Sequence, residues 1–137
     1  MIQYSENGRI PFEKLMDLYN SVGWTAYTKD LNVMKKLLPG ALSYTSAWDG
    51  DRLVGLIRTV GDGCSILYIQ DLLVHPDYQR QGIGQTLVTQ TVAAAENIRQ
   101  IFLSTDNTEK TVQFYRSVGF VTMEETGAVT FIYRGDK

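Results

Sequence analysis

The stretch IQDLLVHPDYQRQGIG, residues 69–84, decides the fold of this chain. It begins with a run of strand formers, Pro76 interrupts that run, and a glycine-bearing loop at 79–84 then opens a long helical pattern. The first turn of a helix leaves backbone N–H groups without partners, and the helix dipole places about half a positive charge there. Gly82 and Gly84 let the backbone approach a phosphate closely. The stretch therefore predicts an anion site between a strand and a helix.

Two common phosphate motifs do not match this loop. A P-loop requires Lys followed by Ser or Thr after its second glycine, whereas Gln85 and Thr86 follow Gly84. The dinucleotide-binding loop requires three glycines, and this loop has two, spaced by one residue. Neither kind of nucleotide binding is therefore indicated.

A third pattern matches the loop at every fixed position. It reads Gln or Arg, two residues, Gly, one residue, and Gly or Ala, and Gln79, Gly82 and Gly84 satisfy it. This is the pyrophosphate loop of the GCN5-related N-acetyltransferase (GNAT) family, which the chain resembles. The segment FYRSVGF, residues 114–120, resembles the family's later signature and follows in the same order. The resemblance is strongest over 69–121 and extends in weaker form over 42–133.

Apolar periodicity and turn residues predict the order of elements along the chain. The order is α-α-β-β-β-α-β-α-β-β, an α/β protein with a mixed sheet flanked by helices, and the family has this order too. No repeat, linker or low-complexity tract divides residues 1–137, so a single domain is expected. Helices are predicted at 11–20, 28–38, 83–97 and 106–118, and strands at 42–48, 52–60, 64–74, 100–105, 120–125 and 129–133.

Local signals predict several boundaries within this order. Thr28 is predicted to cap the second helix, and Asp106 with Glu109 is predicted to form a capping box. The pair Asp49–Gly50 predicts a tight hairpin between two strands. Gly127 is predicted to turn the chain between the two closing strands.

Composition narrows the functional classes. With 13 basic against 15 acidic residues the formal charge is −2, and no basic cluster exceeds Lys35–Lys36, so nucleic acid is not an expected partner. No apolar run approaches the roughly 20 residues of a membrane span, so no membrane partner is expected. The single Cys64 and an N-terminus without a signal-peptide pattern favour a cytoplasmic protein. Cys64 itself is expected to be a small buried side chain.

The resemblance implies acetyl-CoA as the co-substrate and no metal. The family pairs the pantetheine arm with backbone near the end of its central strand, here Leu72, Leu73 and Val74. Gln79 then shapes the pyrophosphate loop, and Asn107 follows the second parallel strand, where the family often contacts the cofactor, although helix capping explains Asn107 equally well. The implied pyrophosphate contacts are the backbone amides of Arg80, Gln81, Gly82, Ile83, Gly84, Gln85 and Thr86, with Arg80 adding countercharge.

The resemblance also implies the catalytic groups. Tyr115 matches the tyrosine with which the family protonates the departing thiolate, and the Leu73 or Val74 amide stands where the family stabilises the oxyanion. The family's two usual glutamate positions hold Tyr68 and Gln70 here, so no base carries over directly. Asp71 and Asp106 are the nearest carboxylates, and a water relay to either one remains an alternative. Asp71 lies inside an apolar strand, where a structural hydrogen-bonding role and a substrate role are equally expected.

The acceptor is predicted to be a primary amine, more specifically that of a small molecule, because a compact, slightly acidic domain offers little surface for a long basic peptide. Trp24 and Tyr27 are predicted to line its pocket, with packing in the core as the alternative, and Tyr68 is predicted to contact it as well. His75 precedes a proline and is expected to fill a loop, and Cys64 is badly placed for a covalent acetyl intermediate. Direct attack in a ternary complex is therefore expected.

Two other functions remain open at this point. One is a non-catalytic acyl-CoA sensor or subunit, which the missing glutamates favour and the retained Tyr115 opposes. The other is a protein or peptide N-acetyltransferase. Family members often dimerise through late strands, so a homodimer is one expected state of the chain, and the sequence decides neither this state nor the acceptor.

Overall fold

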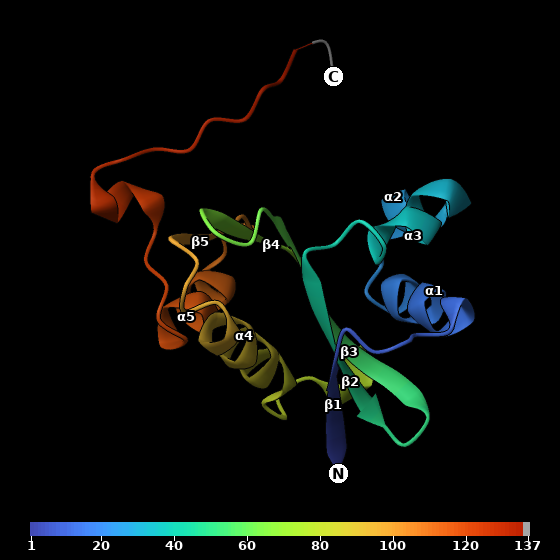
Figure 1. Ribbon diagram of the computed structural model, residues 1–137. Helices are drawn as coiled ribbons and strands as arrows, with labels where there is room; N and C mark the ends of the chain where they lie inside the picture. The colour runs from blue at the N-terminus through green and yellow to red at the C-terminus, as the bar shows by residue number, and fades with distance from the viewer. Residues whose placement is uncertain (136–137) are drawn as a thin grey trace. The chain divides into compact units, whose positions relative to one another are not determined.

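The computed structural model describes residues 1–135, which form two compact units, residues 1–104 and residues from 105 onward (Figure 1). The first unit carries the sheet and all but one of the α-helices. Its elements are β1 (Ile2–Glu6), α1 (Phe12–Ser21), α2 (Thr25–Thr28), α3 (Leu31–Leu37), β2 (Ser43–Asp49), β3 (Arg52–Gly61), β4 (Ile66–Val74), the 3-10 turn η1 (Pro76–Tyr78), α4 (Ile83–Ala94) and β5 (Gln100–Leu103). The single-domain assignment of the whole chain stays a prediction.

The sheet has five strands in the order β1-β2-β3-β4-β5. Neighbours pair antiparallel as far as β4, and β4 pairs parallel with β5, which confirms the predicted mixed sheet. The parallel pair is reached through α4, because parallel neighbours need a crossover connection. The edge strand β1 was not expected from the sequence. It is only five residues long and is held by pairing with β2, from Ile2 opposite Asp49 to Glu6 opposite Thr45.

Helices cover both faces of this sheet (Figure 1). On one face, Leu18 of α1 and Met34 of α3 join Leu56 and Leu73 of the sheet in one buried cluster. On the other face α4 packs so closely that a side chain at Gly55 of β3 would come within 3.0 Å of Ile83. Glycine at position 55 therefore permits the close packing of α4 onto β3.

The strand β4 has two irregularities that place the site. Gln70 has no pairing partner on β3, because the register shifts between the pairs Arg58–Asp71 and Thr59–Ile69. This shift is a β-bulge. On its other side β4 pairs with β5 only over Ile66–Ile69. Among the described residues no strand pairs with that side of β4 from residue 70 to residue 74. The strand therefore ends with an open edge beside β5.

The second unit contains α5 (Glu109–Ser117) and the 3-10 turn η2 (Met123–Thr126). The predicted closing strands at 120–125 and 129–133 are wrong, since neither segment is a strand in the described chain. Thr122 and Glu125 form a capping box that sets up a helical turn, and Gly127 ends that turn in the left-handed region at φ 89°. No strand edge pairs with residues 128–135, and Phe131 is 90% exposed.

Several predicted boundaries also need correction. Asp30, rather than Thr28, caps α3 by accepting bonds from the Asn32 and Val33 amides, because Thr28 is taken up by the short helix α2. Thr108, rather than Asp106, caps α5 and accepts from the Thr111 amide. In both cases the capping residue stands directly before the helix and a competing polar residue lies two positions earlier.

The predicted β2–β3 hairpin is confirmed, with Asp49 opposite Arg52 and Gly50 at φ 61° in the first turn position. Cys64 is exposed, so the prediction of a buried thiol is wrong. It lies in the turn before β4, where the Asp62 carboxylate accepts from the Cys64 and Ser65 amides and holds the backbone at the surface. No helix of the described chain is long and apolar enough to cross a membrane.

Candidate active site

The loop between β4 and α4 places several backbone amides together. Arg80 and Gly82 both adopt left-handed conformations, at φ 66° and 81°, and Gly82 leads directly into α4. The Thr86 amide donates to the Gly82 carbonyl, so the amides before it, from Ile83 to Gln85, have no partner within the helix. No acidic side chain occupies the first turn of α4. These free amides and the helix dipole suit an anion.

Gly82 also leaves space beside the loop. A β-carbon built at this position would meet no heavy atom within 4 Å. Glycine is therefore required here by its backbone conformation and not by protein packing around it. The space lies next to the free amides of α4, and it suits a phosphate group that approaches the backbone closely.

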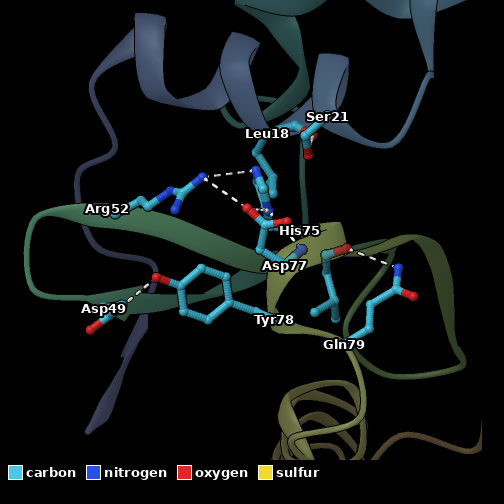
Figure 2. A network of polar contacts seen from close by, with 9 residues as sticks. Leu18, Ser21, Asp49, Arg52, His75, Asp77, Tyr78 and Gln79 are labelled. Carbon is cyan, nitrogen blue, oxygen red and sulfur yellow. Dashed lines mark hydrogen bonds and ion pairs between the residues drawn. The ribbon is translucent and has the colours of Figure 1, made fainter.

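Side chains from the β2–β3 hairpin fix the segment that precedes this loop (Figure 2). Tyr78 donates from its hydroxyl to Asp49, and the Arg52 guanidinium lies 5.4 Å from the centre of the Tyr78 ring. Arg52 Nη2 is 3.0 Å from His75 Nε2, and the Asp77 amide donates to His75 Nδ1 at 3.1 Å. His75 therefore shapes the loop, as expected from its position before a proline.

Gln79 connects this segment to the end of β4. Its Nε2 donates to the Val74 carbonyl at 3.4 Å (Figure 2), and the His75 amide donates to the Val54 carbonyl at 2.8 Å. The chain is thereby held from the last residue of the strand into the loop. Leu72 and Val74 are half-buried and Leu73 is buried in the core, so the open edge of β4 belongs to a well-packed strand. The open strand edge, the loop and the start of α4 follow one another directly along the chain.

Asp71 lies beside the bulge of β4 and is 2% exposed. Its Oδ2 accepts from Arg58 Nε at 2.7 Å and from the Tyr19 hydroxyl at 2.8 Å, while its Oδ1 accepts from the Tyr27 hydroxyl at 3.2 Å. Burial by itself lowers the pKa of Arg58, but the Asp71 carboxylate more than offsets it and leaves that pKa raised. Burial, and after it the charge of Asp71, raises the pKa of Tyr19 well above its usual value. Both oxygens of Asp71 are thus bound to protein donors.

Three aromatic rings meet above this carboxylate. Tyr19 of α1 lies edge-on to Tyr27 of α2, with ring centres 5.5 Å apart, and Trp24 lies 6.0 Å from Tyr19 and 6.2 Å from Tyr27. Tyr19 is fully buried, whereas Trp24 and Tyr27 are half-buried and pack against the core cluster. Trp24 and Tyr27 therefore reach the surface while resting on the core.

Tyr68 lies where β4 and β5 begin to separate, and it is half-buried. Its hydroxyl donates to the Ser104 hydroxyl at the end of β5. Gln70 at the bulge is exposed. No carboxylate occupies either position, and among residues 1–135 no cluster of three or more His, Cys, Asp or Glu side chains can hold a metal ion.

The second unit holds the remaining predicted site residues. Tyr115 of α5 is half-buried between Phe114 and Phe120, with ring centres 5.0 and 5.9 Å away. Burial, and after it the negative charge of Asp106, raises the pKa of the Tyr115 phenol. The phenol therefore keeps its proton at neutral pH. Asn107 is exposed in the segment before α5.

Sequence reasoning missed Tyr19 and Arg58 as parts of a polar network. Tyr19 falls at helical spacing among the apolar residues of the predicted helix 11–20, where packing alone is expected, yet its hydroxyl is bound to Asp71. A usable signal exists in the sequence, because Arg58 and Asp71 are charged residues in the interior of two apolar strands that are adjacent along the sheet. Two isolated charges of opposite sign in neighbouring buried strands are expected to pair.

Three comparisons with known proteins all find acetyltransferases. A family model described as "Acetyltransferase (GNAT) domain" matches residues 17–133. The GNAT family acetyltransferase SP0256 from Streptococcus pneumoniae TIGR4 is 38% identical, with a TM-score of 0.88 and 100% coverage of both chains. A relative called an uncharacterized ycf52-like N-acetyltransferase, from Prochlorococcus marinus, is 29% identical over 130 residues, which cover 90% of this chain and 69% of that protein.

A structure with bound coenzyme shares the fold. It is the aminoglycoside N-acetyltransferase AAC(6')-Iy in complex with CoA, which has a TM-score of 0.74 over 100% of this chain and 96% of its own. Its sequence identity is 15%, so the likeness concerns the fold alone.

Proposed function

This chain belongs to the GNAT acetyltransferase family and is an N-acetyltransferase, and we propose that it acetylates the primary amine of a small molecule by direct attack in a ternary complex with acetyl-CoA. One observation carries this proposal: the open edge of β4 runs directly into a loop and a helix start whose amides are free. A pantetheine arm and a pyrophosphate need these two features in this order.

Acetyl-CoA supplies the acetyl thioester when bound, and the residues of the first unit fit it. The amides from Arg80 to Gln85 offer donors to the pyrophosphate, and the Arg80 side chain adds positive charge. The expected contact from the Thr86 amide is wrong, because that amide already donates to the Gly82 carbonyl at 3.0 Å. The backbone of Leu72, Leu73 and Val74 offers strand-type hydrogen bonds to the arm. A Leu73 or Val74 N–H directed at the thioester carbonyl stabilises the negative charge that develops there.

Proton handling is assigned to two groups. An alkyl ammonium has a pKa of about 10.4, so releasing the free amine at pH 7 costs roughly 4 to 5 kcal/mol. Positions 68 and 70 carry no carboxylate that could accept the proton, so water takes it. Tyr115 is the proposed donor to the thiolate, on the match of residues 114–120 to the family signature. Its raised pKa keeps the proton in place until the thiolate forms, although it makes the transfer more uphill. A direct catalytic role for Asp71 and a cofactor contact of Asn107 stay predictions.

A small amine is the preferred acceptor. The formal charge of −2 and the absence of a basic cluster larger than two residues are compatible with a cationic substrate. Trp24, Tyr27 and Tyr68 are half-buried and offer aromatic faces, which attract ammonium groups. A similar fold serves a protein named as an aminoglycoside N-acetyltransferase.

The test is free thiol released from acetyl-CoA by the purified protein with polyamines, aryl alkylamines, amino sugars, amino acids and short peptides. Release with one class of small amine is the expected result. Release with peptides alone overturns the small-molecule acceptor and supports a protein N-acetyltransferase. Silence across the panel, together with a thermal shift caused by acetyl-CoA, supports a non-catalytic sensor. Ligand at about 100 times its dissociation constant adds roughly 2.7 kcal/mol of stability, which is measurable for a chain of this size.

A homodimer is proposed as the assembly state. Phe131, Ile132 and Tyr133 are each more than 80% exposed, and a run of exposed apolar side chains is typical of an interaction surface. Light scattering after size exclusion tests this, and a monomer at all concentrations contradicts it. The cytoplasmic location stays a prediction.

A further inference from the structure

Asp71 joins two parts of the first unit that the proposed function assigns to different substrates. Its backbone lies next to the segment Leu72–Val74, the proposed binding edge for the acyl donor. Its side chain accepts from the hydroxyl of Tyr27, one of the proposed acceptor residues. A single buried carboxylate therefore belongs to the proposed donor-binding strand and is hydrogen-bonded to a proposed acceptor residue.

The network around this carboxylate is buried, and both of its oxygens are paired. Arg58 Nε and the Tyr19 hydroxyl both bind Oδ2, at 2.7 and 2.8 Å, and the Arg58 and Asp71 side chains are 8% and 2% exposed. Hydrogen bonds to a charged group in such surroundings are stronger than neutral ones. Oδ1 is thereby held in one position, facing α2.

The Tyr27 side chain packs against the core and makes one hydrogen bond, to Asp71. It sits in the four-residue helix α2, which is too short to be stable alone, and it is only half-buried. Trp24 directly precedes this helix, and the Trp24 and Tyr27 rings are in contact, with centres 6.2 Å apart. The bond from the Tyr27 hydroxyl to Asp71 is therefore the polar contact that fixes this aromatic pair relative to β4.

We infer that Asp71 is a positioning residue for the acceptor: through Tyr27 it fixes the Trp24–Tyr27 pair at a set position relative to the donor-binding edge of β4. The inference rests on the proposed function for the identity of the two substrates. Asp71 acts here without touching the amine, which agrees with both of its oxygens being bound to protein donors. The fully buried Tyr19 serves stability, since the apolar core also holds α1 in place.

Two matched substitutions test the inference. Tyr27→Phe and Tyr19→Phe each remove one hydroxyl that donates to Asp71, and each keeps the ring. Tyr27→Phe is expected to raise the acceptor KM about tenfold, consistent with the loss of a hydrogen bond to a charged group. The KM for acetyl-CoA is expected to stay unchanged. Tyr19→Phe is expected to lower the melting temperature and leave the acceptor KM unchanged. A merely structural network predicts a lower melting temperature for both variants and a KM change for neither, and that result overturns the inference.

A second readout does not need turnover. The chain has two tryptophans, so in a Trp48→Phe background all tryptophan emission comes from Trp24. Tyr27→Phe is expected to increase acrylamide quenching of Trp24, and Tyr19→Phe is not. Equal quenching in both variants and the parent overturns the inference even if amines are acetylated. Different quenching in a protein that acetylates no amine leaves the positioning role standing and overturns the proposed function instead.

Discussion

Arg58 Nε lies 2.7 Å from Asp71 Oδ2, and the two side chains are 8% and 2% exposed. Asp71→Asn leaves the Arg58 charge buried and uncompensated, which is expected to lower the free energy of unfolding by about 3 to 5 kcal/mol. Urea denaturation of the variant measures this loss. Thermal melting is the alternative readout if the native state is too poorly populated for extrapolation.

A double change provides the control for this pair. Replacing both charges by apolar residues, as in Arg58→Met with Asp71→Leu, removes the unpaired charge and is expected to restore much of the lost stability. The exposed pair Arg116–Glu125 is a second comparison, because Arg116→Gln is expected to have little effect on stability. A double variant as unstable as Asp71→Asn would show that packing, and not the charge, causes the loss.

Gly82 and Gly127 allow a matched test of the proposed pyrophosphate loop. Their backbones are nearly identical, at φ 81° and ψ 7° against φ 89° and ψ 8°, and a β-carbon at either position meets no atom within 4 Å. Alanine at each is therefore expected to cost a similar roughly 1 to 2 kcal/mol of backbone strain. Only Gly82→Ala is expected to weaken acetyl-CoA binding, by about tenfold or more, measured by calorimetry. Equal affinity in the two variants would place the phosphates elsewhere.

Tyr115→Phe is expected to lower kcat about 100-fold, because a positioned general acid contributes that order of rate. The KM for acetyl-CoA is expected to stay within twofold or so of the parent value, since the hydroxyl acts after binding. Steady-state thiol release measures both constants. Tyr4→Phe on the edge strand β1 is the control and should match the parent protein. An unchanged kcat in Tyr115→Phe would remove Tyr115 from the mechanism.

The rate is expected to rise with pH. The free-amine fraction of an alkylamine increases about tenfold per pH unit below its pKa of about 10.4, so kcat/KM should increase steadily from pH 7 to pH 9. Tyr115 acts in its protonated form, and its raised pKa extends that form to higher pH, so no falling limb is expected in this range. Initial rates in buffers of constant ionic strength test this. A decline centred between pH 7 and 9 that disappears in Tyr115→Phe would contradict the raised pKa of Tyr115.

The sequence alone was sufficient for the loop and the central strand. Gln79, Gly82 and Gly84 follow a run of strand formers, and the structure places the loop and helix start where that local pattern predicts them. The glycine positions and the helix pattern act over a few residues, so no distant contact was needed to interpret them. The β2–β3 hairpin was predictable for the same reason, because Gly50 supplies the positive φ that its turn requires.

Tertiary structure decided the features that depend on partners far apart in the sequence. The prediction of a closing hairpin was wrong because strands at 120–125 and 129–133 require a partner strand edge. The local Thr122–Glu125 capping box, in contrast, was enough to form a helical turn. The role of Asp71 likewise stayed open until folding brought Tyr19 and Tyr27, 52 and 44 residues away in the chain, to its two oxygens. Short-range backbone preferences are written in the local sequence, but the partner of a buried charge or of a strand edge is fixed only by packing.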